Sequence, residues 1–179
     1  MIFKETKLKG AYTIEMEKTE DERGFFAYSY CQKEFRKRGI DFNIVQCNVS
    51  FNKTKGTLRG MHYQSSPFEQ AKLVSCIKGR IYDVIVDLRK ESDTYCLSHA
   101  VELSAEGYKM LYIPKGFAHG YQTLEDNSVV FYQMAEFYHP ECATGVRWDD
   151  PLFSINWPLK VRVISEKDKE QRLFADNTL

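Results

Sequence analysis

The sequence predicts an all-β fold in which two packed sheets form a jelly roll, with a few short helices. Short apolar or alternating runs recur at regular spacing, and turn-forming residues separate them, which is typical of a sandwich or barrel. A jelly roll is favoured among these because doubling the sheet manages its exposed edges. The chain is long enough to bury a core and contains no linker or repeat, so we expect residues 1–179 to form a single domain.

Glycine separates the elements expected in the first third of the chain, because it tolerates the backbone conformations of turns and helix ends. Gly10 and Gly24 lie between short alternating or aromatic runs, and Gly39 ends a charged run of helical composition. The expected elements are two strands within residues 1–17, a strand over 25–30, a helix over 32–38 and a strand over 43–51.

The rest of the chain carries the strongest strand signals, above all a β-branched run over residues 81–88. The final candidate is a helix over 165–174, for which Ser165 can serve as the N-cap. The other expected strands are one that carries Arg59 and His62, one over 70–77, shorter ones at 100–103 and 109–113, one entered through the turn 114–120, and one over 128–138.

Charge and cysteine content narrow the class of protein. The formal net charge is zero, which argues against nucleic acid or a membrane surface as an electrostatically bound partner. Five cysteines without a Cys-x-x-Cys pair predict neither a disulfide framework nor a zinc site, and Cys47 and Cys76 are expected to pack inside strands. No signal peptide or membrane-spanning run is present, so we expect a cytoplasmic protein.

The stretch from Gly56 to Lys72 is the centre of the predicted site. His62 and Lys72 fall at the paired ends of two adjacent expected strands, where they can supply a base and a cation to one pocket. The same pattern is also explained if His62 packs in the core and Lys72 lies on a surface edge. Strand alternation places Arg59 and His62 on opposite faces, and both reach one pocket only if Gly60 marks a bulge or a sharp twist.

Three further positions are singled out by their residue types. Asp83 lies in a run that is apolar on both faces, so it needs a partner such as His, Arg or Lys. Pro114-x-Gly-x-x-His119 is a turn that delivers a histidine to the next strand, as in metal-binding cupins, but a His-x-His pair is missing and no metal is expected. Tyr132 and Tyr138 share one face of their expected strand, as aromatic core or as a proton donor.

Taken together, these motifs resemble the dTDP-4-dehydrorhamnose 3,5-epimerase family, the metal-free cupins of deoxysugar biosynthesis. The matching motifs run in order through most of the chain, which makes chance similarity a poor explanation. They are Asp21-Glu22-Arg23-Gly24-x-Phe26, Gln46-x-Asn48-x-Ser50, Gly56-x-Leu58-Arg59-Gly60-x-His62-x-Gln64, Gln70-Ala71-Lys72-Leu73-Val74, Gly79-x-x-x-Asp83-Val84-x-Val86-Asp87, Ile113-Pro114-x-Gly116-Phe117-Ala118-His119-Gly120, Gly145-x-Arg147-Trp148-Asp149-Asp150-Pro151 and Ser165-Glu166-Lys167-Asp168.

The resemblance implies a cupin-like double-stranded β-helix and an isomerase that inverts C3 and C5 of a nucleotide-linked 4-keto-6-deoxyhexose, with no cofactor. It implies a homodimer with exchanged N-terminal strands. By position, His62 matches the general base, Asp168 its carboxylate partner, and Lys72 the group that stabilises the enolate. Tyr132 matches the proton donor on the opposite face of the sugar. The implied substrate-binding residues are Arg23, which serves the neighbouring subunit's site, Phe26, Gln46, Asn48, Arg59, His119, Tyr138 and Lys167.

Two departures from the family pattern keep alternatives open. Tyr28 stands where a glutamate is usual in the nucleotide-contacting region, so the nucleotide could be CDP or GDP. Gln133 to Glu136 replace a Lys-x-Thr-Asp run after the acid tyrosine, so a single centre could be inverted. A sugar-binding cupin without catalytic activity and a metal-dependent cupin are further alternatives, against which the complete acid–base set and the missing His-x-His pair argue respectively.

Overall fold

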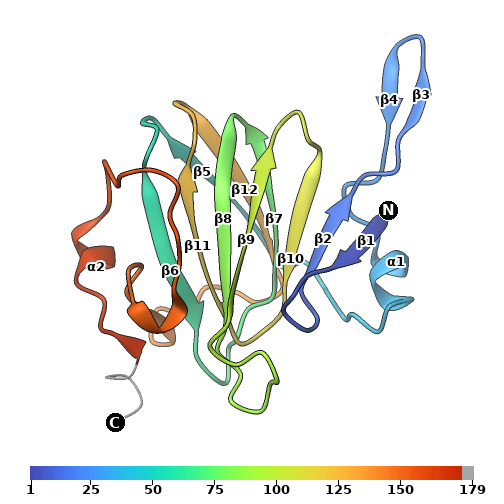
Figure 1. The fold of residues 1–179 in the computed structure, drawn as a ribbon. Helices are drawn as coiled ribbons and strands as arrows, with labels where there is room; N and C mark the ends of the chain where they lie inside the picture. Colours follow the sequence, from blue (N-terminus) through green and yellow to red (C-terminus); the bar gives the residue numbers. More distant parts are fainter. Residues whose placement is uncertain (175–179) are drawn as a thin grey trace.

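Two antiparallel sheets that face each other form the body of the computed structural model, which describes residues 1–174 (Figure 1). Neighbouring strands in each sheet run antiparallel throughout. The strands of this body are β5 (Gln46–Asn52), β6 (Leu58–Gln64), β7 (Lys72–Lys78), β8 (Arg80–Asp87), β9 (Ser98–Ser104), β10 (Lys109–Ile113), β11 (Phe117–Thr123) and β12 (Ser128–Met134).

The strand order confirms the predicted jelly roll. One sheet contains the order β5-β12-β7-β10 and the other the order β6-β11-β8-β9, so the chain crosses repeatedly from one sheet to the other. As a result, strands that are neighbours within a sheet are often distant in sequence, as two interlocked Greek keys require. Helical structure is sparse in the described residues: two short α-helices, α1 (Gln32–Arg36) and α2 (Glu166–Lys169), and a 3₁₀ turn over Pro151–Phe153. No helix in the described part of the chain is long and apolar enough to cross a bilayer.

Smaller strands extend the two sheets and form one projection. β1 (Ile2–Glu5) and β2 (Tyr12–Glu15) continue the first sheet from β10, and β13 (Ala143–Gly145) continues the second from β6. β3 (Thr19–Asp21) and β4 (Gly24–Phe26) form a separate hairpin. This hairpin projects from the β1–β2 side of the molecule, opposite the side occupied by β6 and α2 (Figure 1).

Three apolar clusters hold these layers together. The first fills the space between the sheets and includes Ile85, Leu111 and Val130. The second packs Phe35 of α1 against the outer face of β2, β7 and β10, and the third packs the C-terminal segment, through Phe174, against the outer face of the second sheet. Burial of this apolar area is the main favourable contribution to the free energy of folding, at roughly 25 cal/mol per Å². Apolar side chains therefore pack between the two sheets and against part of the outer face of each.

Six sequence predictions are wrong in extent or burial, and two of them are the helix expected over 32–38, which ends at Arg36, and the strand expected over 43–51, which begins at Gln46. The strand expected over 128–138 ends at Met134, because its partners Gln46 and Lys72 are the end residues of β5 and β7. The strand expected over 25–30 ends at Phe26, since β4 pairs only with the three residues of β3. The helix expected over 165–174 has the predicted Ser165 cap but ends at Lys169. Cys47 is exposed, because strand alternation turns it outward from β5, whereas Cys76 is buried as predicted.

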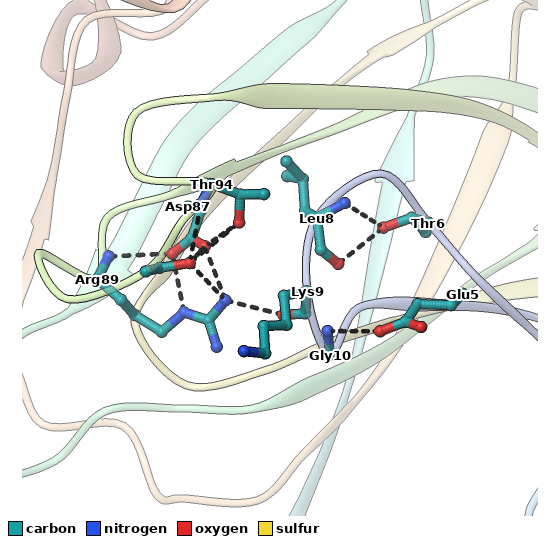
Figure 2. Close-up of polar contacts among 9 residues, drawn as sticks. Glu5, Thr6, Leu8, Lys9, Gly10, Asp87, Arg89 and Thr94 are labelled. Atoms are coloured by element: carbon teal, nitrogen blue, oxygen red, sulfur yellow. Dashed lines mark hydrogen bonds and ion pairs between the residues drawn. The ribbon is translucent and has the colours of Figure 1, made fainter.

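A buried carboxylate ties the first residues of the chain to the second sheet (Figure 2). Asp87, at the end of β8, is fully buried and accepts hydrogen bonds from Arg89, Ser92 and Thr94 at 2.6–2.8 Å. Arg89 also donates to the carbonyl oxygen of Lys9 at 2.8 Å. Burial raises the pKa of Asp87, but these hydrogen bonds outweigh it and hold the pKa at about 2. The charged carboxylate therefore orders the 88–97 loop and docks the β1–β2 turn.

We expect Asp87→Asn to lower the free energy of unfolding by about 3 kcal/mol at pH 7, because it leaves a partly buried arginine without its charge partner. The folded pKa lies below the unfolded value, so this stabilisation is present above about pH 4 and is lost as the pH falls toward 2. Urea denaturation of both proteins across this range measures the difference. Asp149→Asn, which removes an exposed partner of Arg147, is the control and should cost less than about 1 kcal/mol. A difference that stays constant down to pH 2 would contradict this assignment.

Candidate active site

A polar cavity of about 340 Å³ opens between the sheets where β5 and β12 face β6 and β11. Side chains from both sheets line it. From the predicted site residues it brings together Asn48, Arg59, His62, Lys72, His119 and Tyr132, and it adds Ser50, Tyr121 and Met134. We refer to it below as the first cavity.

His62 and Asp168 form a hydrogen-bonded pair at its edge. The His62 Nε2 to Asp168 Oδ1 distance is 2.7 Å, with a half-exposed histidine side chain and an almost completely buried carboxylate. Asp168 also accepts the backbone N–H of Gly60 at 3.2 Å, and the Ser165 hydroxyl accepts the N–H of Asp168. Burial raises the pKa of Asp168, yet the hydrogen bonds from His62 and Gly60 together outweigh it and keep the pKa below its usual value. An ionised Asp168 fixes the imidazole and leaves Nδ1 to exchange a proton.

Gly60 allows Arg59 and His62 to reach the same cavity. Its φ of +129° is a conformation that L side chains rarely adopt, and an added Cβ would lie 2.5 Å from the Cα of Gly120. The β6–β11 register shifts between His119 and Tyr121, beside this close approach. The irregularity that the sequence required at this glycine is therefore confirmed.

Lys72 contributes a buried cation to the cavity. Its Nζ donates to the carbonyl oxygen of His62 at 3.4 Å, which is a long contact, and only 7 % of the residue is exposed. Burial lowers the pKa of Lys72 to about 8, while the charge of Asp83 opposes this shift. The ammonium is therefore the predominant form at pH 7. The surface-edge explanation of this lysine is excluded.

His119 and Asp83 form a second, fully buried pair. Their Nε2 and Oδ1 atoms are 2.6 Å apart, which supplies the partner that the sequence demanded for Asp83. Burial lowers the pKa of His119, with Asp83 acting in the opposite direction, so a neutral imidazole prevails at pH 7. The other carboxylate oxygen, Oδ2, has no hydrogen-bond partner among residues 1–174. Asp83 thus orients His119 and provides a negative charge near Lys72.

Tyr132 lies on the wall opposite His62, since β12 and β6 belong to facing sheets. Its ring meets the His119 ring edge-on, with centroids 6.0 Å apart, and tilts against Tyr121 at 6.3 Å. Burial is the main cause that raises the pKa of Tyr132 well above 10. The phenol therefore keeps its proton at neutral pH and is available as an acid.

Sequence reasoning missed a supporting network that joins the two walls of the cavity. The Tyr121 hydroxyl contacts the Ser50 hydroxyl at 2.9 Å and receives a hydrogen bond from Asn52 at 3.2 Å. Asn52 also accepts from Arg59 Nε at 2.8 Å, which holds the guanidinium in the cavity. Period two from His119 along β11 could have identified Tyr121 as a cavity residue.

A second cavity of about 290 Å³ adjoins the first and shares His62 and Lys72 with it. Tyr138 and Lys167 line it, as does Gln64. The prediction that Tyr138 shares a strand face with Tyr132 is wrong, because β12 ends at Met134. Tyr138 reaches the site from the following loop instead. The two cavities together offer room for a ligand longer than one sugar ring.

Four predicted residues line neither cavity: Asp168, which reaches the site through His62, and three that lie farther away. Gln46 touches the site only through Asn48, to which its side-chain amide donates at 2.9 Å. Arg23 and Phe26 lie on the projecting β3–β4 hairpin, where Arg23 pairs with Asp21. The resemblance assigns Arg23 to the neighbouring subunit's site, but it carries no such indication for Phe26.

This arrangement can move protons at a carbon next to a carbonyl group. It provides a histidine base with a carboxylate partner, a fixed cation and a tyrosine acid on the opposite wall. No group of three or more His, Cys, Asp or Glu side chains that could hold a metal ion occurs in the part of the chain that the structure describes.

Comparisons with known proteins agree on one family. The family model described as dTDP-4-dehydrorhamnose 3,5-epimerase matches residues 5–176. A protein of that name from Methanothermobacter thermautotrophicus is 44% identical over 178 residues, which cover 98% of this chain and 95% of the relative.

Solved structures agree with this result. The crystal structure of dTDP-4-dehydrorhamnose 3,5-epimerase from Elizabethkingia anophelis NUHP1 superposes with a TM-score of 0.97 at 40% identity, covering 100% of this chain and 99% of that one. The dTDP-6-deoxy-D-glucose-3,5-epimerase from Legionella pneumophila Philadelphia 1, solved in complex with dTDP-4-keto-L-rhamnose, gives a TM-score of 0.89 at 39% identity, covering 96% and 92%.

We expect Asp83→Asn to lower the pKa of Lys72 below about 8, because Asp83 is the charge that favours the protonated lysine. The charged fraction of Lys72 at pH 7 should fall accordingly. An NMR titration of the lysine side chains measures this shift, with Lys72→Met to assign the signal. Asp149→Asn, at the exposed Arg147 pair, is the control for a change in net charge. An unchanged titration of Lys72 in Asp83→Asn would contradict the coupling.

Proposed function

The chain belongs to the dTDP-4-dehydrorhamnose 3,5-epimerase family, and on this premise we propose that it converts dTDP-4-dehydro-6-deoxy-D-glucose into dTDP-4-dehydro-L-rhamnose by inverting C3 and C5. One observation carries the proposal. A single cavity contains a paired histidine and a buried lysine, with a protonated tyrosine on the facing wall. Binding alone requires neither a base nor an opposed acid, so a catalytic role explains the set better than a sugar-binding role.

In this proposal, His62 removes the proton from the carbon next to the keto group. That proton is a very weak acid, and imidazole has an unperturbed pKa of only about 6.5, so the developing enolate needs strong stabilisation. Lys72 supplies a fixed cation for the enolate oxygen, and preorganised electrostatic stabilisation of this kind contributes about 3 kcal/mol. Asp168 orients the imidazole and stabilises its charged form.

Tyr132 then returns a proton from the other face of the sugar, which inverts the centre. Its raised pKa supports this role, because the phenol is protonated before the reaction. Removal and return of a proton at the same carbon leave the oxidation state unchanged, so the reaction calls for neither a metal nor a redox cofactor. Proton exchange with water then returns His62 to its neutral form and Tyr132 to its phenol, and repetition at the second carbon flanking the ketone completes the double inversion.

The remaining predicted residues are assigned to substrate binding. Arg59, His119 and Asn48 line the first cavity, where they can contact the sugar. Tyr138 and Lys167 line the second cavity, which suits the diphosphate and nucleoside because a lysine there can pair with phosphate. Gln46 is assigned an indirect role, since it orients Asn48.

We also propose a homodimer in which the β3–β4 hairpin serves the partner's site. Val49, Phe51 and Ile77 are 65%, 50% and 54% exposed on the outer face of the first sheet, and an apolar patch of this kind favours a protein interface. β1 and β2 pair with this chain's own β10, so the exchanged N-terminal segment is the projecting hairpin. An exchange of this kind accounts for the distance of Arg23 and Phe26 from the cavity of their own chain.

Proton exchange measured by NMR in heavy water tests the function. With dTDP-4-dehydro-6-deoxy-D-glucose we expect deuterium at both C3 and C5 and formation of the L-rhamno product. His62→Ala should slow both exchanges about 10²- to 10⁴-fold, the usual effect of losing a general base. Tyr132→Phe should retain exchange without inversion, because the base is present and the opposed acid is absent.

The other outcomes separate the alternatives. Deuterium at C3 alone would replace the double inversion with a single-centre epimerase. Exchange only with CDP- or GDP-linked keto sugars would show that the nucleotide of the substrate is CDP or GDP and not dTDP. The absence of exchange with all of these sugars, together with tight binding of one of them, would identify a protein that only binds its ligand.

Mixed dimers test the partner contribution of Arg23. We expect Arg23→Ala to raise KM about 10- to 100-fold, as for loss of one hydrogen bond to a charged group. His62→Ala chains lack the base but carry an intact hairpin. Mixing the two variants should therefore rebuild complete sites and restore low-substrate activity above the sum of the separate proteins. No recovery in heterodimers verified by mass spectrometry would contradict the exchange.

A further inference from the structure

The segment that carries Tyr138 has no place in either sheet. β12 ends at Met134, and residues 135–142 run along the mouth of the second cavity without strand or helix structure. The Tyr138 side chain is 57% exposed, so its own packing does not fix its position. Something else has to hold this segment if Tyr138 is to form a defined wall of the cavity.

Gln64 supplies one set of these contacts. It is almost completely buried at the end of β6, two residues after His62. Its Nε2 donates to the carbonyl oxygens of Phe68 at 2.7 Å and Phe137 at 3.1 Å, and its Oε1 accepts the N–H of His139 at 2.8 Å. The single amide therefore grips the backbone on both sides of Tyr138.

Gln70 supplies the second set from the loop that leads into β7. It is also buried, two residues before Lys72. Its Nε2 donates to the carbonyl oxygens of Glu136 and Phe137, each at 3.0 Å. The Phe137 carbonyl is thus shared by both glutamines, and the backbone of the segment is fixed immediately before Tyr138.

We propose that Gln64 and Gln70 are positioning residues that clamp the Glu136–His139 backbone, so that Tyr138 forms a preorganised wall for the nucleoside diphosphate in the second cavity. This inference rests on the proposed function. Neither side chain takes part in proton transfer. The clamp connects the base and the cation to nucleotide binding, because Gln64 lies on β6 two residues after His62 and Gln70 lies two residues before Lys72, the first residue of β7.

The physical reason is preorganisation. The clamp orders the backbone during folding, so the ligand does not have to order it on binding. Loss of the clamp removes binding that is equal in the ground and transition states, which raises KM and leaves kcat unchanged. Substitution of a glutamine that matters only for stability would lower the melting temperature without raising KM at constant kcat.

Gln70→Met tests the clamp, because methionine keeps the length of the side chain and removes both N–H donors. We expect KM to rise about 10-fold with kcat within about twofold. Gln122→Met is the matched control. Gln122 is another buried glutamine that binds a loop, through the carbonyl oxygen and N–H of Leu159 at 2.9 and 3.0 Å, and it lines neither cavity. It should lower the melting temperature and leave KM unchanged.

A double-mutant cycle with Tyr138→Ala shows whether the clamp acts through this residue. We expect the rise in KM for Gln70→Met plus Tyr138→Ala to be smaller than the product of the separate rises. Multiplicative effects, or an unchanged KM in Gln70→Met, would overturn the inference. Gln64→Met provides the same measurements from the other strand if Gln70→Met does not fold.

Backbone hydrogen exchange of the free protein provides a readout without substrate. Residues 136–139 should exchange faster in Gln70→Met than in the wild type or in Gln122→Met. Calorimetric binding of dTDP to the same proteins separates the two proposals. A wild type that neither binds dTDP nor exchanges substrate protons overturns the proposed function, whereas an active wild type with an unaltered Gln70→Met variant overturns only the clamp.

Discussion

The hydrogen bond between His62 and Asp168 joins positions 106 residues apart, and the placement of the whole C-terminal segment depends on it. A carboxylate that leaves water must be compensated, and Asp168 gains contacts from β6 at His62 and Gly60. For this carboxylate to lie against β6, Ser165 has to cap α2 and the chain after α2 has to pack on the outer face of the second sheet. Asp150 accepts the N–H of Phe174 at 2.7 Å and fixes that crossing. The tail is therefore part of the site.

The two facing sheets divide the chemistry between them. β6 and β11 supply the two histidines, whose carboxylate partners come from α2 and β8, whereas β7 and β12 supply Lys72 and Tyr132. A polar group in this interior is stabilised by pairing, and each histidine of the second sheet has a carboxylate partner, while Tyr132 lies on the first sheet. The jelly roll thereby keeps two groups of opposite function on opposite walls of one cavity, which a single sheet could not do.

Local sequence patterns were reliable where one residue or one period decides the conformation. Gly10, Gly39 and the Ser165 cap marked real element ends, and the irregularity required at Gly60 is present. The patterns failed where a partner strand decides how far an element extends. Ser128 to Tyr138 has strand composition throughout, but a strand persists only as long as its partners, and β5 and β7 provide none beyond Met134. The prediction of a strand over 25–30 was wrong for the same reason, since β4 has no partner beyond Phe26.

The sequence by itself determined the fold class, because turn residues and strand alternation are local properties of the chain, and its resemblance to a known family named His62, Lys72, Tyr132 and Asp168 as candidate site residues without a structure. Only the tertiary structure decided the hydrogen-bond geometry of His62 and Asp168, the partner of Asp83 and the loop position of Tyr138. Those depend on strand register and chain crossing over long separations, where the free energy of each contact is set by burial and by partners that no local pattern specifies.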